Sequence, residues 1–205
     1  MANEAFRALA KIDREIWVIT AQAPSLAAAP TAPRRGGLLA SWVQAISLDD
    51  AKPALLIALH PDHHTRELVD ASGAFVAHLL RRDQVDLAYR FAAASGRTCD
   101  KWSELAIETT ESGASRLREC AAWVDCRVFA RLATPDRVFY WADCVSGGVE
   151  STASPLRESD FFRTLSAESL SVLRENRLAD IASVAAQAAA WRINLPENLR
   201  FSPAG

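Results

Sequence analysis

The chain has little lysine and no long hydrophobic run. Only three of its 23 basic residues are lysines, and the formal net charge is -2. This balance argues against a broadly basic surface, so we expect no nucleic-acid partner. The longest apolar segments, such as Ala54–Leu59 and Phe75–Leu80, are far shorter than the roughly 18 residues of a membrane-spanning helix. The N-terminus has acidic residues where a signal peptide is apolar. The sequence therefore predicts a cytoplasmic protein without membrane contact.

The chain also has few cysteines and lacks the common nucleotide-binding signatures. None of the four cysteines stands in a CxxC pair, which argues against a redox dithiol motif or a zinc ribbon. The chain contains no GxGxxG, GxxxxGK[ST] or GxSxG motif. These absences exclude the usual Rossmann site, Walker phosphate loop and hydrolase nucleophile elbow. We expect reduced, mostly buried thiols.

The pattern of apolar residues favours a mainly β fold with inserted helices, of the α+β class. Its 205 residues suffice for one well-packed domain. Apolar and β-branched runs predict strands at Ile16–Ala21, Leu38–Leu48 (one strand or two), Ala54–Leu59, Phe75–Leu80, Ala121–Leu132 and Val138–Val145, with Ser146-Gly147-Gly148 closing the last hairpin. Periodic segments predict short helices at Asn3–Lys11, Arg66–Ala71 and from Asp83, as N-cap, to Ala94. Strands and helices do not alternate regularly, so a closed barrel carrying helices fits better than a doubly wound sheet.

The composition changes near residue 150. Ser166–Trp191 is rich in alanine, free of glycine and proline, and carries an apolar stripe at helical spacing. We expect one long helix there, or two that break near Glu175–Arg177. The predicted organisation is a barrel domain over residues 1–150 and a helical extension over residues 151–205, which packs on the barrel or on a dimer partner.

Three of the four histidines lie in the short segment HPDHH. His60, His63 and His64 could bind a metal, but their spacing matches no established zinc pattern, so we predict no metal site. The same turn opens a helix, for which Asp62 is the expected N-cap. The unpaired amides of the first helical turn, up to Thr65, can bind an anion such as a phosphate.

An ordered set of segments covers about Phe6 to Gly148: FRALAKIDREIWVITAQ, GGLLASWVQAISLDDAKPALLIAL, HPDHHTRELVDASGAFVAHLL, DQVDLAYRFA, DKW, LRECAAWVDCRVFARL and DRVFYWADCVSG. Together these segments resemble the flavin reductase-like family, whose members are FMN-binding split barrels. Their order and spacing carry the resemblance, since each motif alone is weak. The resemblance implies an FMN-binding split β-barrel with a C-terminal helical extension.

The resemblance also implies where a flavin would bind. The segment Leu39–Ser47 would line the isoalloxazine ring and the ribityl chain through Leu39, Ala40, Ser41, Trp42, Val43, Gln44 and Ser47. Because alternate strand residues share a face, Ser41 and Ser47 are expected to meet the flavin together. The turn comprising His60, Asp62, His63, His64 and Thr65 would hold the phosphate. Lys101 and Trp102 would lie near the flavin, contributed by the same subunit or its partner.

The chain departs from the family pattern at three positions. His78 stands where the family has an asparagine and is expected near the cofactor, and Leu39 replaces a threonine. Arg137 replaces a histidine that is associated with nicotinamide binding, and no other catalytic side chain is indicated. Arg137 could pair with a phosphate of NADPH, could block the nicotinamide, or could be a solvated turn residue.

The leading hypothesis is an NAD(P)H-dependent flavin reductase that transfers hydride from nicotinamide to flavin N5. We expect FMN as cofactor, with FAD as the alternative, NAD(P)H as substrate, a homodimer, and an unidentified electron acceptor or partner oxygenase. One alternative is a flavin-binding electron carrier without nicotinamide turnover of its own. Another is a split-barrel module that binds haem or a different ligand through the HPDHH histidines.

Overall fold

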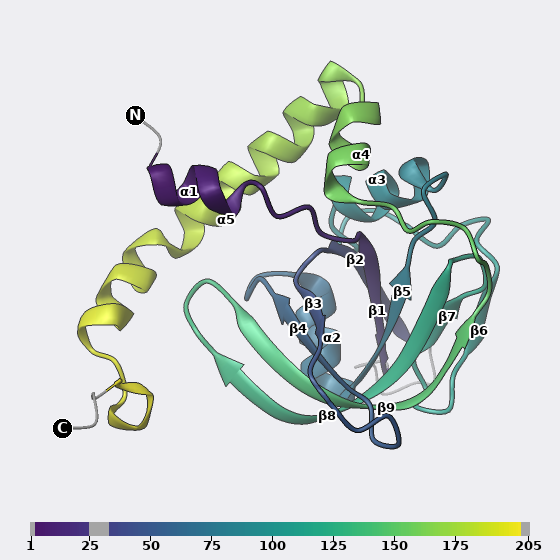
Figure 1. The fold of residues 1–205 in the computed structure, drawn as a ribbon, viewed down its shortest axis with the longest axis horizontal. Helices are drawn as coiled ribbons and strands as arrows, with labels where there is room; N and C mark the ends of the chain where they lie inside the picture. The colour runs from purple at the N-terminus through teal and green to yellow at the C-terminus, as the bar shows by residue number, and fades with distance from the viewer. Residues whose placement is uncertain (1–2, 25–32, 202–205) are drawn as a thin grey trace.

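The computed structural model describes residues 3–24 and 33–201 and is built around a curled antiparallel sheet (Figure 1). The sheet has seven strands in the order β2-β1-β5-β8-β9-β4-β3. Their bounds are β1 Trp17–Ala23, β2 Arg34–Ala40, β3 Val43–Ala45, β4 Ala54–Leu59, β5 Ala74–Leu79, β8 Ala122–Ala133 and β9 Val138–Val149. A separate two-stranded ribbon pairs β6 Ile107–Thr109 with β7 Ser115–Leu117. The predicted mainly β fold with inserted helices is confirmed.

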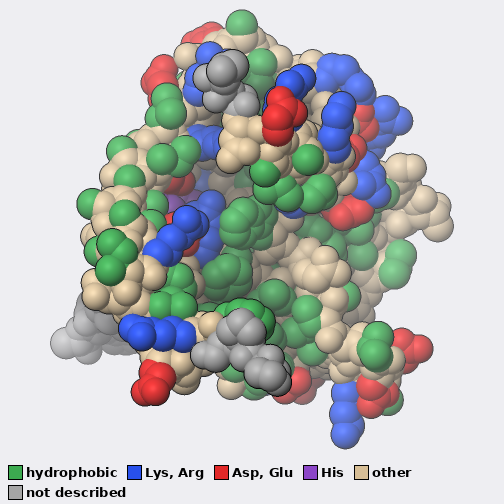
Figure 2. Space-filling model, turned by 60° about the vertical axis from the view of Figure 1, so that its left-hand side comes forward, with side chains coloured by type: hydrophobic (Ala, Val, Ile, Leu, Met, Phe, Trp, Pro, Cys, Tyr) green, Lys and Arg blue, Asp and Glu red, His purple; other side chains and the backbone are tan. Residues whose placement is uncertain are grey.

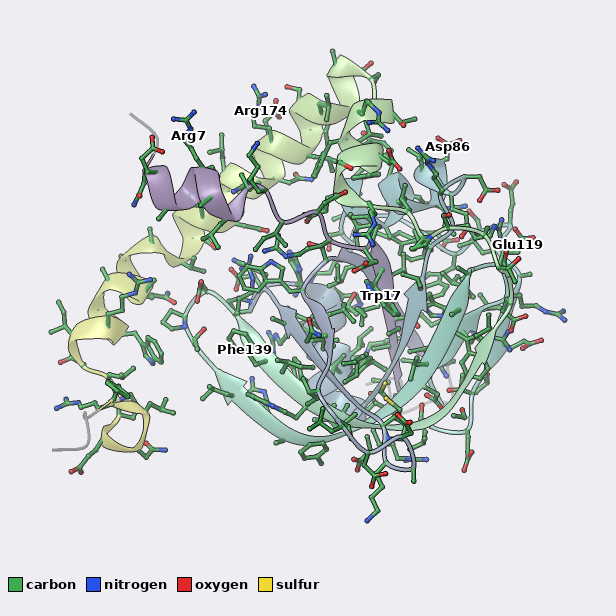
Figure 3. The ribbon with its side chains drawn as sticks, viewed as in Figure 1. Arg7, Trp17, Asp86, Glu119, Phe139 and Arg174 are labelled. Carbon is green, nitrogen blue, oxygen red and sulfur yellow. The ribbon has the colours of Figure 1, made fainter. Side chains whose placement is uncertain are left out.

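The sheet curls because its two edge strands are joined directly. β2 and β3 lie at opposite edges, yet only Ser41 and Trp42 separate them in the chain. The edges must therefore approach one another, and the sheet forms a half-barrel. Its inner face holds the main core, which includes Ile19, Ile57 and Phe75. Trp17 of β1 packs against this core (Figure 3).

Two helices pack closely on β2. They are α2 His64–Ser72 and α3 Val85–Ala93. A Cβ atom on Gly36 would lie 2.7 Å from Leu68 Cδ1, and one on Gly37 would overlap the ring of Phe91. Only glycine at these positions leaves room for α2 and α3 to approach the strand this closely.

The ends of several elements differ from the sequence predictions. The N-caps of α2 and α3 are His63 and Gln84, not Asp62 and Asp83, and neither makes a side-chain capping bond. The predicted end of the β8–β9 hairpin at Ser146–Gly148 is also wrong, because β9 continues to Val149. A Cβ on Gly148 would come within 2.8 Å of the Trp123 indole nitrogen, so the glycines let the strand continue past this large ring.

The remaining helices lie mainly at the ends of the chain. They are α1 Glu4–Leu9, α4 Glu158–Thr164, α5 Ala167–Ile193 and the 3-10 turn Glu197–Leu199. Phe161 of α4 joins Ile16 and Leu80 in a second buried cluster. α5 is one unbroken helix, and Ser166 caps it by accepting a bond from the amide of Ser169.

α5 runs diagonally past the barrel (Figure 1). Arg174 points away from the barrel (Figure 3), whereas Val184 is buried. Among the described residues, no helix has both the length and the apolar character needed to cross a membrane. The division into a barrel domain and a helical extension remains a prediction.

Candidate functional site

A cleft of about 700 Å³ lies between the barrel and α5. Figure 2 shows the side of the molecule on which α5 faces the viewer, with basic side chains bordering hydrophobic ones in a hollow. Five segments line the cleft: the second half of β2, the turn before α2, the end of α3 with the loop that follows it, the β8–β9 turn and one side of α5. Its volume is within the range of pockets that hold a cofactor-sized ligand.

One end of the cleft has the character of an anion site. The amide of Arg66 donates to the His63 carbonyl (3.0 Å), whereas those of His64 and Thr65 have no hydrogen-bond partner among the described residues. Thr65 is buried and lines the cleft. Arg97 approaches from the loop after α3 and donates to the carbonyl of Asp62 (2.9 Å). Free amides, a helix N-terminus and a guanidinium together favour a phosphate.

The histidine turn contacts α5 through Asp180. The Asp62 amide donates to His60 Nδ1 (3.2 Å), so His60 Nε2 carries the proton and faces the Asp180 carbonyl at 3.3 Å. His63 Nε2 lies 3.4 Å from a carboxylate oxygen of Asp180. His63 Nδ1 is buried without a partner, in the part of the chain that the structure describes. Burial lowers the pKa of His63, and the nearby Asp180 carboxylate opposes this shift.

The ligand atoms of His60, His63 and Asp180 lie within 4.8 Å of one another, close enough to hold a metal ion. The hydrogen bonds of His60 argue against a metal ion here. Its Nδ1 lone pair already accepts the Asp62 amide, and its Nε2 is protonated, so neither ring nitrogen has a lone pair free for a metal. The absence of a metal site therefore stays a prediction. The sequence contains no signal for Asp180, which reaches the turn only through the docking of α5.

Arg137 lies on the wall of the cleft. It follows the β8–β9 turn, and its guanidinium carbon lies 4.8 Å from the centre of the Trp42 ring. This separation is typical of a cation–π contact. Arg137 is half-buried, which differs from the reading of a solvated turn residue. Trp42 itself is 45% exposed.

Lys101 reaches the cleft from within its own subunit. Its ammonium group donates to the carbonyls of Gly37 (3.2 Å) and Phe91 (3.0 Å). Burial lowers the pKa of Lys101 to about 8. Trp102 does not line this cleft and instead packs edge-on against Phe91, with ring centres 5.7 Å apart. Lys101 therefore holds β2 and α3 together beside the cleft.

Most of the predicted ring-binding segment lies elsewhere. Leu39 lines the cleft, but the lining does not include Ala40, Ser41, Trp42, Val43, Gln44 or Ser47. Ser47 follows the end of β3 and accepts from the amide of Asp49 at 3.1 Å. The shared face expected for Ser41 and Ser47 is wrong, because Ser41 sits at the bend between β2 and β3 and Ser47 lies outside any strand.

His78 is buried away from the cleft, contrary to the expectation of a cofactor contact. Its Nδ1 donates to the Val18 carbonyl (3.0 Å), and its Nε2 accepts from the Leu117 amide (3.0 Å). No ring nitrogen is left for a ligand. Burial lowers its pKa to about 4, so the ring is neutral and fixes β7 to the sheet.

Sequence reasoning missed several residues that line the cleft. Arg97 stands in a polar loop without a motif. Asn176, Arg177 and Ile181 belong to α5. Asn176 also donates to the Ala93 carbonyl (3.0 Å), which attaches α5 to the end of α3. The alanine-rich pattern predicts the helix but carries no information about which side covers the cleft.

Comparison with known proteins identifies a family for most of the chain. The model of the family described as "Flavin reductase like domain" matches residues 9–161, which include the whole barrel and end within α4. The actinorhodin polyketide dimerase of Streptomyces coelicolor is 30% identical over 137 residues, covering 66% of this chain and 76% of that protein. Diflavin flavoprotein A 1 of Synechocystis is 22% identical over 144 residues, covering 70% of this chain. The chain spans only 21%, 24% and 23% of the three diflavin flavoproteins it matches.

Solved structures share the same fold. The NADH:FAD oxidoreductase SgcE6 of Streptomyces globisporus has a TM-score of 0.64 at 16% identity, covering 77% of this chain and 88% of that one. Component B of nitrilotriacetate monooxygenase from Mycobacterium thermoresistibile has a TM-score of 0.62 at 20% identity, covering 75% and 80%. The predicted split-barrel fold is thereby confirmed.

Proposed function

Because the chain belongs to the flavin reductase-like family, we propose that it is an oxidoreductase that binds FMN in the cleft and reduces it with NAD(P)H. The observation that carries this proposal is the anion site at the start of α2, in a cleft of about 700 Å³. The structural relative SgcE6 has been solved with NAD and FAD fragments, which supports a nicotinamide substrate here.

The residues present fit the phosphate of a flavin nucleotide. The amides of His64 and Thr65 and the hydroxyl of Thr65 supply donors at one end of the cleft. Arg97 adds positive charge there, although it is partly neutralised by Glu67 at 2.7 Å. FMN, with a single terminal phosphate, suits this compact donor set, and FAD is the alternative.

The rest of the cleft is suited to a flat aromatic ring. Leu39 from β2 and Ile181 and Val184 from α5 contribute apolar side chains to its lining. When bound, a flavin supplies the hydride acceptor for this chemistry. The apolar walls orient the ring and exclude water, and hydride transfer needs no acid or base from a side chain. The lack of a catalytic triad or carboxylate pair is therefore consistent with the proposal.

Arg137 bears on how a nicotinamide would bind. Its guanidinium is held against Trp42 at the cleft wall, with several planar donors available to a phosphate. We propose that it pairs with a phosphate of NADPH. The same position supports a second candidate function, in which Arg137 occupies the nicotinamide site and the protein is an electron carrier without nicotinamide turnover.

The proposal includes a cytoplasmic homodimer that passes reduced flavin or electrons to an acceptor or a partner oxygenase. The name of the relative called monooxygenase component B supports a two-component arrangement. Exposed apolar residues on α5 outside the cleft lining, among them Leu178 and Ile193, support a role of the 151–205 extension in self-association. Light scattering coupled to gel filtration tests the dimer.

The central experiment is to identify and titrate the cofactor. The purified protein is denatured and the released chromophore is quantified, and the apoprotein is then titrated with FMN and FAD. Stoichiometric flavin binding followed by flavin-dependent oxidation of NADH or NADPH is the expected result. Flavin binding without nicotinamide oxidation would favour the electron carrier, and a Soret band in place of flavin bands would favour the haem-binding alternative.

A further inference from the structure

Cys126 and Cys144 face each other across the hairpin of β8 and β9. They are direct partners in the strand register, beside an irregularity between Asp125 and Cys126. The amide of Cys144 donates to the Pro53 carbonyl at 2.9 Å and so points away from β8. The two cysteines therefore form a non-hydrogen-bonded pair, in which Cα atoms lie about 4.5 Å apart. Disulfides span Cα separations of about 4.4–6.8 Å.

The two thiols also share one face of the sheet and interact. Cys126 is fully buried in the main core, and Cys144 packs against that core while remaining half-exposed. The Cys126 thiol donates to the Val124 carbonyl, with 3.8 Å between sulfur and oxygen, and the interaction with its neighbour raises the pKa of Cys126 and lowers that of Cys144. Cys144 is thus both the more accessible sulfur and the one that more readily becomes a thiolate. Neither Cys99, which is exposed, nor Cys120, which is buried, has such a partner among the described residues.

We propose that Cys126 and Cys144 are a reversible oxidation site that closes a cross-strand disulfide when hydrogen peroxide oxidises Cys144. The Cys144 thiolate attacks one peroxide oxygen, and the O–O bond breaks as the S–O bond of a sulfenic acid forms. The leaving hydroxide takes the proton of the former thiol and becomes water. The Cys126 sulfur then attacks the Cys144 sulfur, and its proton leaves with the hydroxyl group as a second water. Two thiols lose two electrons, and one peroxide gains them.

The test uses the full-length protein with the other two thiols removed. A Cys99→Ser/Cys120→Ser double variant is exposed to hydrogen peroxide at neutral pH, quenched with catalase, unfolded and alkylated. We expect both remaining thiols to resist alkylation, with an intact-mass loss of two hydrogen atoms that a dithiol reductant reverses. A gain of oxygen atoms without this loss, or two thiols that still alkylate, would overturn the proposal.

A matched variant tests the order of the steps. Cys126→Ala in the same background leaves Cys144 without its partner, and alanine is small and apolar enough for the core. We expect this variant to gain oxygen on Cys144 and to form no intramolecular disulfide. Peroxide that leaves Cys144 unmodified, in a variant whose circular dichroism matches the parent, would show that Cys144 is not the attacking thiol. Peroxide is added directly, so the result does not depend on flavin binding.

Discussion

Replacing Thr65 with valine tests the phosphate site directly. Thr65 is 2% exposed and sits in the first turn of α2, where β2 passes close by at Gly36. Valine keeps both branches of the side chain and nearly the same volume, so the packing against β2 is preserved. The substitution removes one hydroxyl donor and leaves the backbone amides of His64 and residue 65 in place.

The expected loss follows from that single donor. A hydrogen bond to a charged group contributes about 1.5–3 kcal/mol. Since each 1.4 kcal/mol corresponds to a factor of ten, the Kd for FMN should rise by about 10- to 150-fold in Thr65→Val. Fluorescence titration of the apoprotein measures this change. Thr65→Ser keeps the hydroxyl and should bind FMN within a few-fold of wild type.

Riboflavin separates a phosphate contact from a general disturbance of the cleft. It has the same ring and ribityl chain as FMN but no phosphate, so its Kd should be similar in wild type and Thr65→Val. Wild-type affinity of a folded Thr65→Val protein for FMN would refute the reasoning. Equal losses for riboflavin and FMN would refute it too, because the hydroxyl would then act on the shape of the cleft.

Further predictions concern Arg137 and His78. Arg137→His removes the guanidinium that stacks on Trp42 and that would pair with a phosphate of NADPH. We expect the KM for NADPH to rise and the KM for NADH to change little. Faster oxidation of both nucleotides would instead support the role in which Arg137 blocks the nicotinamide site. His78→Leu leaves the Val18 carbonyl and the Leu117 amide unpaired, and chemical denaturation should show a loss of about 2–5 kcal/mol with unchanged FMN affinity in the folded protein. The folded-state pKa of His78, about 4, lies below the 6.5 of an exposed imidazole, so the unfolded chain takes up the proton first. This difference in pKa should add about 3 kcal/mol to the free energy of unfolding above pH 6.5, and the addition should be lost as the pH falls towards 4. His78→Leu has no imidazole at this position and should not show that loss.

The strands were predictable because burial on a sheet leaves a local signature. Ala54–Leu59 matches β4 at both ends, since a mostly buried strand is recognisable as an unbroken apolar run. The pairing of these strands was not predictable from local pattern. The junction at Ser41 and Trp42 joins the two sheet edges, and the alternation rule fails there because the chain bends.

Some residues of the candidate site could likewise be predicted from local sequence, and others could not. The turn before α2 can be proposed from the sequence because a helix N-terminus has a recognisable start and a known affinity for anions, and the structure places Asp62, His63, His64 and Thr65 on the cleft. The position of His78 cannot be predicted in this way, because a histidine in an apolar strand gives the same sequence pattern whether its ring contacts a ligand or two backbone groups. The partners that decide the matter, Val18 and Leu117, are 60 and 39 residues away in the chain.

α5 forms one wall of the cleft but lies outside the region that the family model matches. The family match ends at residue 161, whereas Asn176, Asp180 and Ile181 all lie beyond it. α5 is attached by the bond from Asn176 to Ala93 and by the contacts of Asp180 with the histidine turn. The His63–Asp180 pair is 38% and 42% exposed, so it contributes at most about 1 kcal/mol. The region that the family model matches therefore supplies the turn before α2 and the loop that carries Arg97, while α5, beyond that region, forms the opposite wall of the cleft.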